Sequence, residues 1–151
     1  MMGLASLTMN PRVSVIARKR GADVLRPLSD EHPDDELFDG LLILRPEEHI
    51  YFVNAQNVGD QVRALVAKYQ PKVVALDFNR VPGVEYSALQ LLMDGDKQVA
   101  GSGVAWLLVG LNPGVLEAVR KAGLADQLGA ERLLFNARAA IEKFQAMQAT
   151  S

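Results

Sequence analysis

The 151-residue sequence contains no cysteine, only two histidines and no long apolar run. The missing cysteines exclude disulfides, thiolate metal sites and cysteine nucleophiles. The longest apolar segments, such as residues 104–109, are far shorter than the ~18–20 residues that span a bilayer. His32 and His49 have no metal-ligand partner at a usable spacing, so we interpret both as surface residues. We therefore expect a soluble chain without a metal site or a cofactor.

The sequence also lacks an excess of either charge, since 16 Lys and Arg face 18 Asp and Glu. This balance argues against a nucleic-acid partner bound through bulk positive charge. Locally the charge is uneven: basic residues dominate 12–26, whereas 29–39 contains acidic residues and no Lys or Arg. We interpret 29–39 as a solvated acidic loop, with partner docking on this loop as the alternative.

The length fits one domain, and 49% hydrophobic with 23% charged residues is an ordinary globular composition. The first residues lack the basic and long apolar regions of a signal peptide. We expect residues 1–11 to be a linker or an expression remnant, residues 12–147 to be the domain, and residues 148–151 to be a tail.

Hydrophobic patterning predicts an α/β fold, with right-handed crossovers that place the helices mainly on one face of a mixed sheet. Strands are predicted at 13–18, 41–44, 50–53, 73–78, 104–109 and, at a sheet edge, 133–135. Helices are predicted at 55–69, 86–100, 113–122 and after residue 136, with Asn54, Asn112 and Asn136 as N-caps. Because 41–44 and 50–53 are close in sequence, we expect them to pair as an antiparallel hairpin.

The motifs of common catalytic sites are absent. Neither a G-x-x-x-x-G-K-[ST] loop nor a G-x-G-x-x-G motif occurs. Gly101-Ser102-Gly103 is interpreted as a helix-to-strand turn, and Asp94-Gly95-Asp96 lacks the other ligands of a calcium loop. Asp77 ends a buried strand, but without a base or a metal we interpret it as a structural carboxylate. A hydrolase that uses Asp77 or Glu85 has no supporting residues, so no catalytic residue and no enzyme activity are predicted.

The loop around Pro82-Gly83 leads into a predicted helix whose first turn contains Ser87. Unpaired N–H groups and the positive end of the helix dipole favour an anion at such a position. A phosphate on Ser87, or an anion bound beside it, would meet that field. The alternative is an ordinary serine near a helix start.

These segments carry a family resemblance. Val73-Val-Ala-Leu-Asp77, with Val81-Pro82 and then Glu85-Tyr86-Ser87-Ala88-Leu89, resembles the STAS domain of sulfate-type (SulP) anion transporters and of bacterial anti-sigma factor antagonists. The upstream segments Gly40-Leu-Leu-Ile-Leu-Arg45 and Ile50-Tyr-Phe-Val-Asn-Ala55 are similar to the carboxy-terminal cytoplasmic domain of a bacterial SulP transporter. The resemblance covers about residues 12–145.

The resemblance implies an anti-sigma-antagonist-like mixed sheet of about four to six strands with four to five helices. It also implies a non-catalytic regulatory domain on the cytoplasmic side of the inner membrane. Its partners would be the membrane domain, a second protomer of a full-length homodimer, a regulatory protein or a weakly bound nucleotide. We expect the docking or anion- and nucleotide-binding loop at Pro82, Gly83, Glu85, Tyr86 and Ser87.

The alternative is a free-standing anti-sigma factor antagonist that is switched by phosphorylation of Ser87. The resemblance aligns Ser87 with the phosphorylated serine of that branch. Glu85 replaces the usual aspartate, Tyr86 the first hydroxyl residue and Ala88 the glycine. These differences count against phosphorylation, so we keep the antagonist as the second hypothesis.

Overall fold

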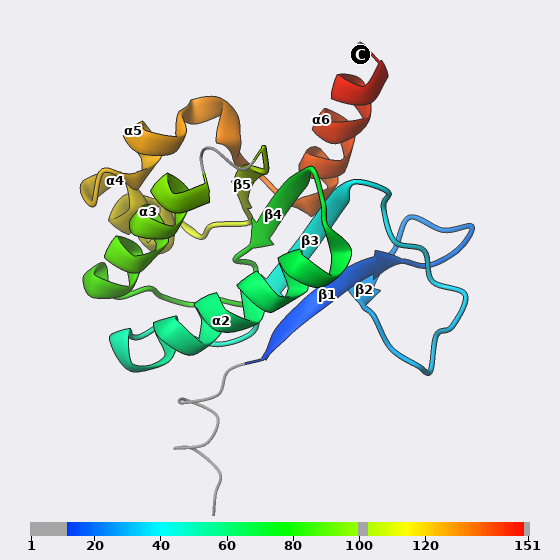
Figure 1. The fold of residues 1–151 in the computed structure, drawn as a ribbon, viewed down its shortest axis with the longest axis horizontal. Coiled ribbons are helices and arrows are strands. Elements are labelled where there is room, and N and C mark those ends of the chain that lie inside the picture. Colours follow the sequence, from blue (N-terminus) through cyan, green and yellow to red (C-terminus); the bar gives the residue numbers. More distant parts are fainter. Residues whose placement is uncertain (1–11, 100–102, 150–151) are drawn as a thin grey trace, which may run out of the picture.

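The structure, a computed structural model, describes residues 12–99 and 103–149. They form a six-stranded sheet in the order β2-β1-β3-β4-β5-β6, with helices on both faces (Figure 1). The strands are β1 (Val13–Arg18), β2 (Leu25–Pro27), β3 (Leu41–Pro46), β4 (Val73–Asp77), β5 (Ala105–Val109) and β6 (Leu133–Leu134). The helices are α2 (Phe52–Tyr69), α3 (Tyr86–Val99), α4 (Pro113–Lys121), α5 (Leu124–Leu128), the 3₁₀ turn η1 (Ala130–Arg132) and α6 (Ala137–Ala149). The expected linker 1–11, Gly101, Ser102 and the end of the tail lie outside the described residues.

The second half of the sheet is parallel. β3 pairs with β4, β4 with β5 and β5 with β6, all in the same direction. Every residue of β4 is buried, as expected for a parallel strand that is covered on both faces. The α/β prediction is therefore confirmed, and the six strands and five α-helices of residues 12–99 and 103–149 lie within the expected numbers.

The two faces of the sheet carry separate apolar clusters. On one face, Leu42, Leu44 and the other inward residues pack against α2, α3, α4 and α5. On the other face, Leu41 and Ile43 pack against the buried side of α6, which includes Ile141 and Phe144. Four of the five α-helices in the described part of the chain thus lie on one face, which confirms the predicted unequal covering.

The predicted hairpin of 41–44 with 50–53 is wrong. β3 pairs antiparallel with β1, through Val13 opposite Pro46 and Val15 opposite Leu44, and parallel with β4. Residues 52 and 53 are already helical, and Ile50 makes only an isolated bridge to Val84. A short apolar run does not separate a strand from a buried helix start.

Asn54 is not the N-cap that the sequence predicted, because α2 begins three residues earlier, after Tyr51. Its fully buried side chain instead holds the turn before the helix. Oδ1 accepts a hydrogen bond from the Tyr51 N–H at 2.9 Å, and Nδ2 donates to the His49 carbonyl at 3.0 Å. The predicted caps Asn112 and Asn136 are confirmed, since their Oδ1 atoms accept from the N–H groups of Val115 and Ala139.

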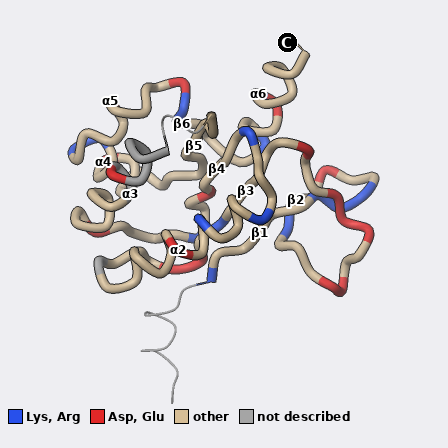
Figure 2. Tube along the Cα trace, viewed as in Figure 1, with Lys and Arg blue, Asp and Glu red and all other residues tan. Residues whose placement is uncertain are grey.

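The acidic loop 29–39 lies beside the basic β1 and β2 at one end of the molecule (Figure 2). Arg26 donates from Nε and Nη2 to the two carboxylate oxygens of Asp35, each at 2.7 Å. The backbones of Arg18 and Glu36 exchange two hydrogen bonds of 2.8–2.9 Å. Acidic and basic segments that look separate in the sequence are therefore paired in the fold.

Candidate functional site

The parallel strands end at one edge of the sheet, which we call the carboxyl edge. It is made by the connections 47–51, 78–85, 110–112 and 135–136, which follow β3, β4, β5 and β6. β1 runs antiparallel to β3, so it starts at this edge, where the Glu47 N–H donates to the Arg12 carbonyl at 3.0 Å. The start of β1 therefore lies at the same edge as the loops that follow the parallel strands. Open α/β sheets place their binding sites in such loops.

Two apolar side chains of the loop 78–85 anchor it in the core. Phe78 and Val81 are both buried in the core beneath α2 and α3. The Phe78 N–H donates to the Val109 carbonyl at 2.9 Å, and the Val81 N–H donates to the Phe78 carbonyl at 3.0 Å. The start of the loop is thus an extension of the sheet.

The second half of this loop pairs with the segment that precedes α2. The Ile50 N–H donates to the Gly83 carbonyl at 3.0 Å, and the Glu85 N–H donates to the Ile50 carbonyl at 2.9 Å. This parallel bridge brings the starts of α2 and α3 next to each other. Each helix start carries an exposed tyrosine, since Tyr51 precedes α2 and Tyr86 opens α3.

Gly83 is required by packing at this bridge. A Cβ atom on Gly83 would lie 2.5 Å from Cε1 of His49. The His49 ring also stacks on Tyr51, with centroids 4.2 Å apart and planes inclined by 21°. His49 was interpreted as a surface residue of a hairpin turn; in the structure it is half-buried and covers the loop.

The structure brings all five predicted site residues into one exposed segment. Pro82 and Glu85 are exposed, Gly83 and Ser87 are half-buried, and Tyr86 is 64% exposed. The Glu85 carbonyl accepts from the N–H groups of Ala88 and Leu89, whose side chains are fully buried. Ser87 therefore lies in the first turn of α3, as the sequence predicted.

Asn112 ties this segment to the neighbouring connection. Its Nδ2 donates to the Pro82 carbonyl at 3.2 Å, while its Oδ1 caps α4. His49, Tyr51 and Asn112 were not predicted as site residues. No sequence pattern indicated a role for the His49 and Tyr51 rings. Asn112 lies at a strand-to-helix junction, but it was predicted only as a helix cap.

Asp77 has the structural role that the sequence analysis favoured. Nε and Nη2 of Arg45 both donate to its Oδ2, at 3.2 and 3.1 Å, and its Oδ1 accepts from the Asn79 N–H at 2.9 Å. A Cβ on Gly110 would lie 2.7 Å from that Oδ1. The carboxylate is thus enclosed by its partners and joins the ends of β3 and β4.

The remaining candidates do not assemble into a site. Asp94 and Gly95 lie inside α3, so the helix replaces any calcium loop there. Among residues 12–99 and 103–149, no three His, Asp or Glu side chains are grouped as metal ligands. Across the same residues, no helix has the length and apolar character needed to cross a bilayer.

Comparison with known proteins assigns the family. The family model described as "STAS domain" matches residues 32–140, well over half of the chain. The chain belongs to the STAS domain family. It is 26% identical to the probable sulfate transporter 4.2 of Arabidopsis thaliana over 81% of this chain and 20% of that protein. The STAS chain thus spans about a fifth of the length of its curated relatives.

Solved structures share the fold. The murine anion transporter Slc26a9 superimposes with a TM-score of 0.81 at 18% identity, over 95% of this chain and 24% of that one. The STAS domain of a SulP transporter from Vibrio cholerae gives 0.65 at 19% identity, over 80% and 93%. A putative anti-sigma factor antagonist of Thermotoga maritima gives 0.60 at 21% identity, over 72% and 90%. The domain therefore shares its fold with solved structures from both branches that the sequence resembles.

Proposed function

We propose that this STAS domain is the non-catalytic regulatory part of a SulP-type anion transporter and lies on the cytoplasmic side of the inner membrane. It would act by contacts with the membrane domain, with a second protomer or with a regulatory protein. The sequence similarity to two sulfate transporters supports the transporter branch.

The observation that carries this proposal is the position of the start of β1. Arg12 and Val13 lie at the carboxyl edge, beside Glu47 and Pro46. The resemblance implies that a membrane domain joins the chain ahead of β1. Such a domain would lie next to the exposed segment 82–87, which makes this segment the natural place for a regulatory contact.

The side chains of this edge suit a protein contact. Tyr51, Val53 and Tyr86 are large exposed residues at the starts of α2 and α3. Tyrosines are common anchors of protein interfaces, because they bury a large area while losing little side-chain entropy. Glu85 adds a charged group next to them. A rigid surface with aromatic anchors and a polar rim is what a docking site needs.

The test is a set of substitutions in the full-length transporter. Glu85→Gln, Tyr86→Ala and Ser87→Ala together should lower anion uptake several-fold without lowering the melting temperature of the isolated domain. A matched control changes Glu142→Gln, Gln145→Ala and Met147→Ala, which are exposed on α6, and should leave uptake unchanged. Unaltered uptake, trafficking and partner capture in the first variant would show that this site assignment is wrong.

A second candidate function is the phosphorylated antagonist, which the fold likeness to the Thermotoga protein supports. Ser87 lies in the first turn of α3, where a phosphate would gain from the helix dipole. Intact-mass measurement after incubation with cell extract and ATP tests this function, with Ser87→Ala as the control. A phosphate that maps to Ser87 would favour the antagonist, and its absence would favour the transporter domain.

A further inference from the structure

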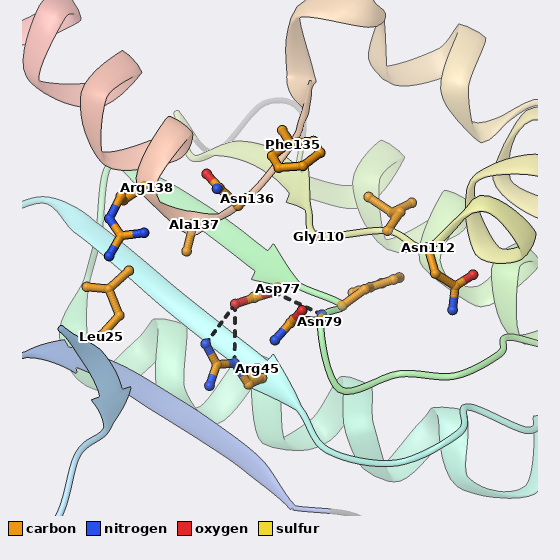
Figure 3. Close-up of a pocket in the computed structure, with 12 residues that line it drawn as sticks. Leu25, Arg45, Asp77, Asn79, Gly110, Asn112, Phe135, Asn136, Ala137 and Arg138 are labelled. Carbon is orange, nitrogen blue, oxygen red and sulfur yellow. Dashed lines mark hydrogen bonds and ion pairs between the residues drawn. The ribbon is translucent and has the colours of Figure 1, made fainter. Parts of the chain in front are cut away.

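A cavity of about 530 Å³ opens at the carboxyl edge (Figure 3), and none of residues 82–87 lines it. It lies among the connections that follow β4, β5 and β6 and reaches β2 on its far side. Its lining includes Leu25, Arg45, Asp77, Gly110, Phe135 and Arg138. Of these, the sequence singled out only Asp77, as a structural carboxylate.

The topology of the sheet singles out this place. The connection after β5 leads to α4 on one face, and the connection after β6 leads to α6 on the other. Neighbouring parallel strands whose following helices go to opposite faces leave a crevice between their connections, and ligands of open α/β sheets bind in it. Residues 110–112 and 135–138 line the cavity from these two connections.

Two arginines supply hydrogen-bond donors. Arg45 is only 11% exposed and uses Nε and Nη2 on one oxygen of Asp77. Arg138 uses Nε on Oδ2 and Nη2 on the carbonyl of Asp23, both at 2.8 Å. A guanidinium has five N–H donors, so each arginine keeps donors beyond these bonds. Figure 3 shows both side chains directed into the space between β3 and the start of α6.

The charge of the cavity is balanced, because Asp77 and Asp23 offset the two arginines. A ligand would therefore be held by directed hydrogen bonds more than by net potential. The first N–H groups of α6, at Ala137 and Arg138, add to these donors, since the first turn of a helix lacks partners within the helix. An oxyanion fits such a set of donors.

An apolar wall borders the donors. Phe135 is 88% exposed and lines the cavity. Leu25 borders the cavity from β2. This exposed aromatic ring lines the same cavity as the two arginines and offers a stacking surface for a flat group.

We propose that this cavity binds a small organic anion, with its oxyanion on Arg138 and Arg45 and its flat apolar part on Phe135. This inference goes beyond the proposed regulatory function and does not depend on it, because it uses neither Ser87 nor a protein partner.

The test is an ¹H–¹⁵N NMR titration of the 151-residue chain with phenyl phosphate. The amides of Gly110, Ala137 and Arg138 should shift in a saturable way. Inorganic phosphate should bind more weakly, and benzyl alcohol, which has the ring but no charge, should bind more weakly still. Shifts that centre on other residues, or equal shifts with all three probes, would overturn the proposal.

Two variants separate a ligand contact from a structural role. Arg138→Gln and Asp23→Asn break the same exposed ion pair. Arg138→Gln should weaken phenyl phosphate by about tenfold, since it removes a charged hydrogen bond, whereas Asp23→Asn frees Arg138 and should preserve or tighten binding. Equal weakening by both variants would mean that the ion pair between Arg138 and Asp23 acts only by holding the local structure, and would overturn the proposal.

Phe135→Ala tests the apolar wall and should remove the preference for phenyl phosphate over inorganic phosphate. Arg63→Gln is the matched charge control, because Arg63 forms an exposed ion pair with Asp60 on α2. It should leave the titration unchanged. A loss in Arg63→Gln equal to that in Arg138→Gln would show a general charge effect and refute the assigned site.

Discussion

The loop 78–85 joins β4 to α3 and the acidic loop 29–39 joins β2 to β3, and different forces hold these two connections. Phe78 and Val81 anchor the first loop in the core, and Ile50 pairs with its backbone. In the second loop, Leu37 remains exposed, and Asp35 and Glu36 are held by ion pairs to β2 and β1. Buried apolar side chains and main-chain pairing therefore fix the first loop. The second combines the main-chain pairing of Glu36 with Arg18 and the half-buried Phe38 with ion pairs.

This difference has consequences for recognition. Ion pairs near water contribute little and weaken with salt, so we expect the acidic loop to open locally before the loop 78–85 does. A surface that is already fixed loses less conformational entropy when it binds. The carboxyl edge is thus the better prepared of the two surfaces for a specific partner.

The largest expected effect concerns the ion pair of the carboxyl edge. Asp77→Ala leaves Arg45 buried without its partner, and removing one member of a buried pair costs about 3 kcal/mol. We expect urea unfolding to show this loss, and Asp77→Leu combined with Arg45→Met to recover most of it. Asp35→Ala is the matched change in the acidic loop and should cost less, because the Arg26 side chain is 28% exposed and that of Arg45 only 11%. Equal losses for Asp77→Ala and Asp35→Ala would remove the distinction between the two regions.

A smaller effect is expected from Gly83→Ala, because the new Cβ would force the His49 ring away from the loop. Overpacking of this kind costs about 1–2 kcal/mol. His49→Ala in the same chain should relieve the clash, so the double variant should lose less stability than the sum of the single changes. Strict additivity in thermal unfolding would show that the ring and the loop are not coupled.

The elements that were predicted correctly from the sequence are those whose burial follows from the pattern of their own residues. The apolar runs of β3, β4 and β5 and the asparagines before α4 and α6 are local signals, and the structure places them as expected. β2 was missed, because it is three residues long and ends in proline. Its pairing with β1 depends on neighbouring strands, and no local pattern encodes that pairing.

In the site, too, features set by local sequence were predicted and those set by contacts between separate segments were not. Tyr86 and Ser87 were placed correctly, because a loop with Pro82-Gly83 ahead of a periodic apolar run marks a helix start. The role of His49 could not be predicted, since it depends on a contact with Gly83 that joins two connections. The same kind of contact explains why residues 52 and 53 were wrongly predicted as strand. Asn54 was taken for the N-cap of the helix, but its side chain bonds to the backbones of Tyr51 and His49 and so lies inside a helix that starts earlier.

The smallest effect is expected where Arg26 meets Asp35. The Arg26 guanidinium lowers the pKa of the Asp35 carboxyl, chiefly through their hydrogen bonds. A carboxyl whose pKa is lower in the folded state stabilises it above its unfolded pKa of about 3.9, and this stabilisation disappears as the pH falls through the lower folded pKa.

Arg26→Gln removes this pairing at neutral pH. Hydrogen exchange should then quicken at the amides of 29–39, while the amides of 78–85 keep their protection. High salt should reproduce part of the change in the unaltered chain, because ions screen the partly exposed Arg26 guanidinium. Faster exchange in both loops would mean that the acidic loop and the carboxyl edge open as one unit, so that charge pairing at one end of the molecule supports the surface at the other.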